Sequence, residues 1–129
     1  MATKQGTIKA PSDINIQAHE MATARALADA GYDVEFARRI EGYRVTSPDV
    51  VIGGVLWEMK APQAGNRKAI ERNLRKASKQ SANIIFDSQR MRGISDAEVE
   101  REPNKYAGLI KAVKRLRFVN RNRDVIDIK

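Results

Sequence analysis

The segment TSPDVVIGGVLWEMKAP, residues 46–62, is the most strand-like part of the chain. Two β-rich runs, Val50–Ile52 and Val55–Lys60, flank the dipeptide Gly53-Gly54, which suits a tight turn with positive φ. The segment therefore predicts a β-hairpin.

Charged side chains are unexpected inside this hairpin. Asp49 precedes the first run, and in the second run alternation places Glu58 and Lys60 on one face and Trp57 and Met59 on the other. A carboxylate and an amine are thus predicted to project together, while Trp57 faces the core.

Composition limits the classes of function. The chain has 129 residues, about the size of one domain, and a net charge of +8 from 24 Lys and Arg against 16 Asp and Glu. Such a surface attracts polyanions, with nucleic acid first among them. The absence of cysteine excludes disulfides and thiolate chemistry. No apolar run approaches the roughly 18 residues of a membrane span, and the start is not that of a signal peptide.

The N-terminal part predicts an arm followed by a helix. Residues 1–12 are polar, contain Gly6 and Pro11, and are interpreted as a flexible arm before a single domain over 13–129. Ser12 or Asp13 is the expected cap of a helix over 14–30, which Gly31 ends.

Further elements alternate after this helix. Apolar and polar side chains alternate over residues 32–40, which predicts a strand before the hairpin. Residues 66–82 are predicted to form a basic amphipathic helix. Residues 83–87 fit a buried strand, which is expected to be parallel to a neighbour because a helix precedes it. This αβββαβ order predicts an α+β domain built on one central mixed sheet flanked by helices.

The last third is predicted as two helices and a hairpin. Residues 95–102 fit a short capped helix, residues 106–116 a second helix, and residues 117–128 a hairpin that turns at 120–123. The second helix is expected to direct four apolar side chains inward: Leu109, Ile110, Val113 and Leu116.

The acids and the lysine of the hairpin suit phosphodiester hydrolysis. A divalent ion held by carboxylates neutralises a phosphate, activates water and stabilises the leaving oxygen. Asp49 and Glu58, on adjacent strands, are placed to converge on one ion, and Lys60 to orient or activate the water. The alternative from spacing alone is a solvated Glu and Lys on an edge strand.

Two resemblances rest on this segment. "PD", eight further residues and then "EMK" are similar to the motif of the PD-(D/E)xK nuclease superfamily, which implies a restriction-endonuclease-like fold. Over residues 14–87, "AHEMATARALADAGYDVEF", "SPDVVIGGVLWEMKAP" and "IERNLRKASKQSANIIFD" resemble the C-terminal toxin domain of contact-dependent growth inhibition proteins (CdiA), a group that cleaves transfer RNA.

The second resemblance implies a metal-dependent site. Carried over residue by residue, its acids and lysine are Glu20, Asp49, Glu58 and Lys60, with the three acids as metal ligands. Mg²⁺ is the expected ion, with Mn²⁺ or Zn²⁺ as alternatives. Without the resemblance, Glu20 would be interpreted as a surface residue.

Substrate-binding residues are expected beside this site. Asn73, Lys76 and Gln80 fall on one side of the basic helix, and the Gln80 segment recurs in the family. Arg72 and Lys79 belong to its diffuse phosphate-binding face, for which a merely solvated face is the alternative. His19 is a candidate ligand or phosphate contact, against the alternative of a packing or exposed histidine.

Three functions remain open at this stage. The first is a ribonuclease toxin that acts on transfer RNA or another structured RNA in the cytoplasm of a target bacterium. It would be delivered as part of a larger secreted protein and would have an acidic immunity protein as its partner. Few aromatic residues, 5% of the chain, favour contacts to phosphate and sugar over base stacking. The others are a PD-(D/E)xK DNA endonuclease and a non-catalytic basic nucleic-acid-binding module.

Overall fold

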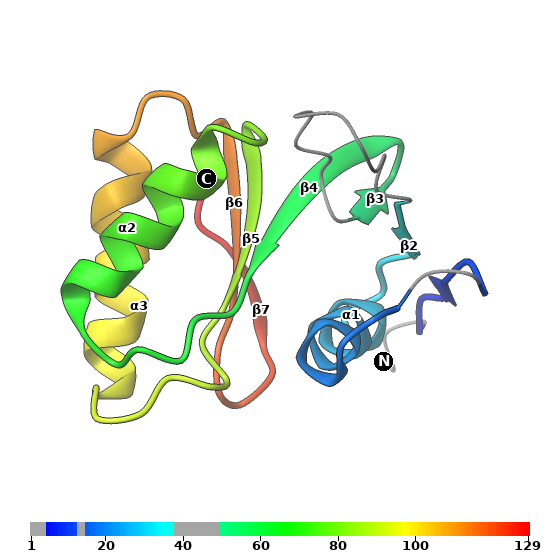
Figure 1. The fold of residues 1–129 in the computed structure, drawn as a ribbon, viewed down its shortest axis with the longest axis horizontal. Coiled ribbons are helices and arrows are strands. Elements are labelled where there is room, and N and C mark those ends of the chain that lie inside the picture. The colour runs from blue at the N-terminus through cyan, green and yellow to red at the C-terminus, as the bar shows by residue number, and fades with distance from the viewer. Residues whose placement is uncertain (1–4, 13–14, 38–49) are drawn as a thin grey trace.

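The computed structural model describes residues 5–12, 15–37 and 50–129, which form three helices and seven strands (Figure 1). In chain order these are β1 (Ile8–Lys9), α1 (Ala18–Asp29), β2 (Val34–Phe36), β3 (Val50–Ile52), β4 (Val55–Lys60), α2 (Arg67–Ser78), β5 (Asn83–Asp87), α3 (Asp96–Leu109), β6 (Arg115–Val119) and β7 (Val125–Asp127). The predicted α+β class is confirmed, and so is the αβββαβ order from α1 to β5.

All seven strands belong to one mixed sheet in the order β1-β2-β3-β4-β5-β6-β7. The run from β2 to β4 is antiparallel, β5 is parallel to both β4 and β6, and β7 returns antiparallel to β6. The parallel environment predicted for residues 83–87 is therefore confirmed. Ile8 and Lys9 form β1, which pairs in parallel with β2. A strand within the first dozen residues was not predicted from the sequence.

The β3–β4 hairpin forms as predicted. Gly53 and Gly54 occupy its turn with φ of 59° and 77°, a conformation that L side chains rarely adopt. Val50 pairs with Trp57, which fixes the register of the hairpin. This register determines which face of the sheet each side chain of β4 meets.

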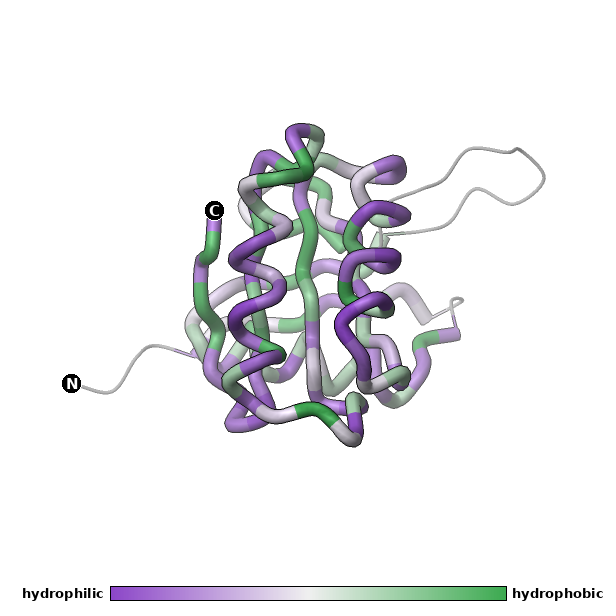
Figure 2. The backbone as a smooth tube through the Cα atoms, turned by 90° about the vertical axis from the view of Figure 1, so that its left-hand side faces the viewer, coloured by the Kyte–Doolittle hydropathy of each residue, from purple (hydrophilic) through white to green (hydrophobic). Residues whose placement is uncertain are grey.

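Helices cover both faces of the sheet (Figure 1). On one face, α2 and α3 pack against the core side chains of β5 and β6, including Ile84, Phe86 and Phe118. On the other face, α1 packs in a second cluster that contains Trp57, Met59 and Ile85. In Figure 2, which looks onto α2 and α3, the turns of both helices carry much hydrophilic colour, while hydrophobic strand segments lie behind them.

The basic helix forms close to its predicted place. The Asn66 side chain caps α2 by accepting a hydrogen bond from the Ala69 amide at 2.8 Å. Ile70, Leu74 and Ala77 are buried, and the six basic residues of the segment are exposed: Arg67, Lys68, Arg72, Arg75, Lys76 and Lys79.

None of the helices in the described part of the chain has the length and apolar character of a membrane span.

Two helix predictions are corrected by the structure. Helix α1 starts at Ala18 with Gln17 as its N-cap, so the expectation that Ser12 caps it is wrong; Asp13 lies outside the described residues. The predicted helices 95–102 and 106–116 are instead the single helix α3, which passes through Pro103 and is capped by Ser95.

The chain becomes extended where the second of these helices was expected to continue. Ile110 already has extended backbone angles, and residues 115–119 form β6, where hydrogen bonds to β5 and β7 outweigh the helical spacing of the apolar residues. Ile110, Val113 and Leu116 are buried as expected, whereas Leu109 is 59% exposed. The hairpin that turns at 120–123 is confirmed.

Candidate active site

A polar pocket of about 270 Å³ lies where α1, the end of β4, α2 and the loop after β5 meet. It brings together five of the residues predicted from the sequence as site residues: His19, Glu20, Glu58, Lys60 and Asn73. These residues span more than fifty positions of sequence, so only the fold makes them neighbours. The remaining lining residues are Gln17, Thr23, Met59, Ala61, Pro62 and Arg90.

Glu58 and Lys60 project from an interior strand. Strand β4 is hydrogen-bonded to β3 on one side and to β5 on the other, and Glu58 is only 4% exposed. The Lys60 ammonium lies 4.0 Å from Glu58 Oε1. The alternative of a solvated pair on an edge strand is therefore wrong, because both the strand position and the burial of Glu58 contradict it.

Gln80 holds the Glu58 carboxylate. In the amide orientation that matches donors with acceptors, the Gln80 nitrogen donates to Glu58 Oε2 at 2.5 Å and to Oε1 at 2.9 Å. Burial of a carboxylate is costly unless hydrogen bonds compensate it, and Gln80 and Lys60 supply that compensation from two elements. The interaction fixes the direction in which the carboxylate faces the pocket.

Helix α1 contributes Glu20 and His19 from its first turn. Glu20 Oε1 accepts a hydrogen bond from the backbone amide of Gln17 at 3.1 Å, so this side chain also caps the helix. The side chain is half-buried and lines the pocket opposite β4. Glu20 is thus a partly exposed residue of the helix surface that also borders the pocket.

The α2 residues predicted to bind substrate separate into two groups. Asn73 lines the pocket and donates to the Ala69 carbonyl at 2.7 Å. Arg72, Lys76 and Lys79 are exposed and do not line it. They belong to the basic outer surface of α2.

Asp49, the remaining predicted ligand, lies outside the described residues. Among the residues that the structure describes, no group of three or more His, Asp or Glu side chains is arranged to hold a metal ion. The described carboxylates at the pocket are Glu20 and Glu58.

Arg90 is a pocket residue that the sequence analysis missed. Its Nε donates to the Ala61 carbonyl at 2.9 Å, and its Nη2 donates to the same oxygen. Nothing in the local sequence signals this role, because Arg90 reaches the pocket only when the loop after β5 folds back over the end of β4.

The comparisons identify the family of this chain. The family model described as contact-dependent growth inhibition CdiA C-terminal domain matches residues 46–125. The chain belongs to the CdiA C-terminal domain family. A CdiA C-terminal domain is the toxin part of a larger secreted protein that is delivered to target cells.

A solved structure has the same fold. The chain superposes on the "CdiA-CT/CdiI toxin and immunity complex from Burkholderia pseudomallei" with a TM-score of 0.67 and 24% sequence identity, over 96% of this chain and 99% of that chain. No curated protein sequence matches the chain. The resemblance to the CdiA C-terminal toxin domain is therefore confirmed, and the PD-(D/E)xK assignment stays a prediction.

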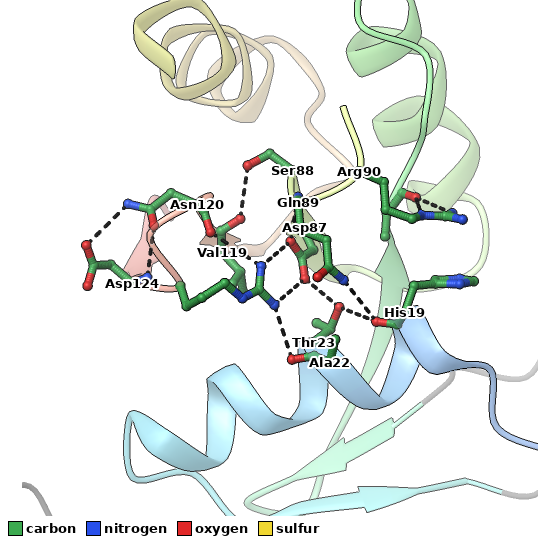
Figure 3. A network of polar contacts seen from close by, with 12 residues as sticks. His19, Ala22, Thr23, Asp87, Ser88, Gln89, Arg90, Val119, Asn120 and Asp124 are labelled. Carbon is green, nitrogen blue, oxygen red and sulfur yellow. Dashed lines mark hydrogen bonds and ion pairs between the residues drawn. The ribbon is translucent and has the colours of Figure 1, made fainter. Parts of the chain in front are cut away.

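In this CdiA C-terminal domain, an ion pair between the buried Asp87 and the part-buried Arg123 holds α1 against the sheet (Figure 3). Asp87, fully buried at the end of β5, forms two hydrogen bonds of 2.9 Å with the guanidinium of Arg123. Arg123 also donates to the Ala22 carbonyl of α1 at 3.1 Å. Thr23 of α1 donates its hydroxyl to Asp87 at 2.6 Å.

The same network reaches the pocket. Thr23 lines the pocket, and its hydroxyl lies 3.1 Å from the carbonyl of His19. The Gln89 side chain donates to that carbonyl at 3.3 Å, and the Gln89 amide donates to Asp87 at 2.9 Å. The first turn of α1, which carries Glu20, is therefore positioned by contacts with residues at the end of β5 and in the loop that follows it.

The variant Arg123→Met is expected to lower the free energy of unfolding by about 3 kcal/mol, because it leaves the Asp87 carboxylate buried without its counter-ion. Chemical denaturation measures this change. The matched control is Arg75→Met, which removes an exposed Arg paired with Glu71 one helical turn away and should cost about 0.5 kcal/mol or less. Equal losses in the two variants would contradict a structural role for the Asp87–Arg123 pair.

Proposed function

We propose that this CdiA C-terminal domain is a metal-dependent ribonuclease that cleaves transfer RNA in the cytoplasm of target bacteria. The observation that carries the proposal is the convergence of Glu20, Glu58 and Lys60 from separate elements on one polar pocket. CdiA C-terminal toxin domains are usually nucleases, which supports the reaction class. The PD-(D/E)xK assignment is part of the proposal and rests on the residues of β4 and on Asp49.

The donor set fits a hard divalent cation. Glu58 and Glu20 offer carboxylate oxygens, the ligands that Mg²⁺ and Mn²⁺ prefer, and the chain has no cysteine and one histidine, which makes Zn²⁺ a poorer match. Asp49 would complete the set, as the family resemblance implies. A bound ion would supply Lewis-acid stabilisation of the phosphate charge and a more acidic water.

The remaining pocket residues take supporting roles. Lys60 lies beside Glu58 and is placed to orient the attacking water or to stabilise the charge that develops on the phosphate. Gln80 keeps the Glu58 carboxylate in one orientation. Asn73 and His19 border the pocket and are placed to contact the phosphate or sugar next to the scissile bond.

RNA would be held by charge on the outer surface of α2. The six exposed basic residues of α2 and its C-cap face solvent beside the pocket, and Arg72, Lys76 and Lys79 form no ion pair with another described residue. Contacts of this kind bind phosphates and carry little sequence information. Recognition by shape therefore suits a folded RNA.

An immunity protein is the expected protein partner. The structural neighbour is a toxin and immunity complex, and a producer of a nuclease needs protection from it. Because the chain carries a net charge of +8, an inhibitor with an acidic face that covers the pocket would be electrostatically complementary.

The first test is cleavage of total bacterial RNA and of plasmid DNA, each with Mg²⁺, Mn²⁺, Zn²⁺ or EDTA. We expect loss of the transfer RNA band with Mg²⁺ or Mn²⁺ and protection in EDTA. Glu58→Gln should lower the rate by about 100-fold or more, because it removes a charged ligand. The control Glu100→Gln changes an exposed residue of α3 and should cleave normally.

Other outcomes of this assay contradict the proposal in different ways. Nicked plasmid with intact RNA would indicate a DNA endonuclease. Inertness toward both substrates in every metal would indicate a binding module in which Glu58 is structural.

Glu20 has a helix-capping role and a proposed metal-binding role, and two substitutions separate them. Gln at this position can still accept the Gln17 hydrogen bond but lacks the charge, so Glu20→Gln should retain its unfolding midpoint and lose about 100-fold in cleavage rate. Glu20→Ala should lose activity and also about 1 kcal/mol of stability. Cleavage rates and thermal unfolding measure both. Full activity in Glu20→Gln would assign the residue to capping alone.

A further inference from the structure

A second depression adjoins the candidate active site. It is lined by Gln63, Gln89, Arg90 and Arg92, with a volume of about 450 Å³. Arg90 lines both this depression and the active-site pocket, so the two are contiguous. The lining contains two guanidinium groups and two amides, and no acidic side chain.

The walls of this depression are fixed by backbone packing. It lies between the segment after β4 and the loop after β5, and these approach so closely that a Cβ on Gly65 would lie 1.4 Å from the Arg92 carbonyl oxygen. Arg90 is tied to the Ala61 carbonyl, and Gln89 to the His19 carbonyl and Asp87. Gln89 is therefore held by the network that positions α1, and Arg90 by the end of β4.

Its side chains match a nucleic-acid backbone. Guanidinium groups bind phosphate oxygens through charge-assisted hydrogen bonds, and amides bind sugar hydroxyls and base edges. Arg90 uses Nε and Nη2 for Ala61, while Nη1 makes no hydrogen bond within the described part of the chain. Arg92 lines the depression and is exposed.

We propose that this depression, lined by Gln63, Gln89, Arg90 and Arg92, is a second phosphate-binding subsite that holds the RNA backbone next to the nucleotide being cleaved. This inference rests on the proposed function of the neighbouring pocket. Arg90 bridges the two sites, and Arg92 binds the adjoining phosphate. The subsite sets the direction in which the strand leaves the active site.

The test is binding without cleavage. The affinity of a transfer RNA transcript is measured by fluorescence anisotropy in EDTA at several salt concentrations, for the wild type, Arg92→Gln and Lys114→Gln. Lys114 is also an exposed cation and lies next to the start of β5, at the opposite end of that strand from the loop that carries Arg92. Both substitutions remove one positive charge, so a general charge effect is the same in both.

Arg92→Gln is expected to raise Kd about tenfold and to reduce the slope of log K against log salt by about 0.7–0.9, the loss of one phosphate contact. Lys114→Gln should stay within about twofold of the wild type. In the cleavage assay Arg92→Gln should raise KM and leave kcat unchanged, because Arg92 lies away from the reacting phosphate.

Equal weakening in the two variants, or unchanged affinity in Arg92→Gln, would overturn the subsite. Since binding is measured in EDTA, this result is independent of whether the protein cleaves RNA. A selective loss in Arg92→Gln without cleavage in any metal would support the subsite and reject the nuclease.

Discussion

The ion pair of the buried Asp87 with the part-buried Arg123 is the interaction on which the arrangement of the site depends. It joins the end of β5, the β6–β7 turn and helix α1 through Thr23 and the Ala22 carbonyl. Arg123 adopts a positive φ of 68°, an uncommon conformation for a residue with a side chain. In this conformation its guanidinium reaches both Asp87 and the Ala22 carbonyl. An ion pair taken out of water is favourable only when its hydrogen bonds are well satisfied, and Asp87 receives four from Arg123, Thr23 and the Gln89 amide.

This network and the strand β4 determine the position of the candidate site from two sides. Strand β4 carries Glu58 and Lys60 at the interior of the sheet, and the network fixes the helix turn that carries Glu20. Gln80, from the segment after α2, then orients the Glu58 carboxylate. A basic chain thus retains two acids, Glu20 and Glu58, at one pocket, and the proposed function has them bind a cation that faces a phosphate.

Local sequence patterns predicted the elements whose signals are short-range. The glycine turn, the core positions of Trp57 and Met59 on β4 and the apolar stripe of α2 each follow from contacts within a few residues, and each of these predictions is confirmed. The burial of Glu58 on the other face of β4 does not follow from the alternation. The boundary between α3 and β6 was predicted wrongly because Leu116 fits a helical spacing as well as a strand, and pairing with β5 and β7 decides between them.

The parts that the sequence did not predict depend on contacts between distant segments. Arg117 lies between the rings of Tyr32 and Trp57, at 4.1 and 4.4 Å from their centroids, although the three residues belong to different elements. Arg90, Arg123 and the role of Gln80 beside Glu58 were missed for the same reason. Glu58 and Lys60 were predicted from the alternation of the hairpin, whereas Glu20 was predicted because the family resemblance supplied the long-range information. The metal-binding role of the acids remains a prediction.

The most direct measurement of the central claim is a crystal structure of the protein with Mn²⁺, with the ion located by its anomalous scattering. The account predicts a peak at the active-site pocket within about 2.2 Å of a Glu58 oxygen, with Glu20 and Asp49 as neighbouring ligands. A crystal with Mn²⁺ bound elsewhere, or with the Glu58 carboxylate bonded to Gln80 and Lys60 alone at saturating Mn²⁺, would contradict it.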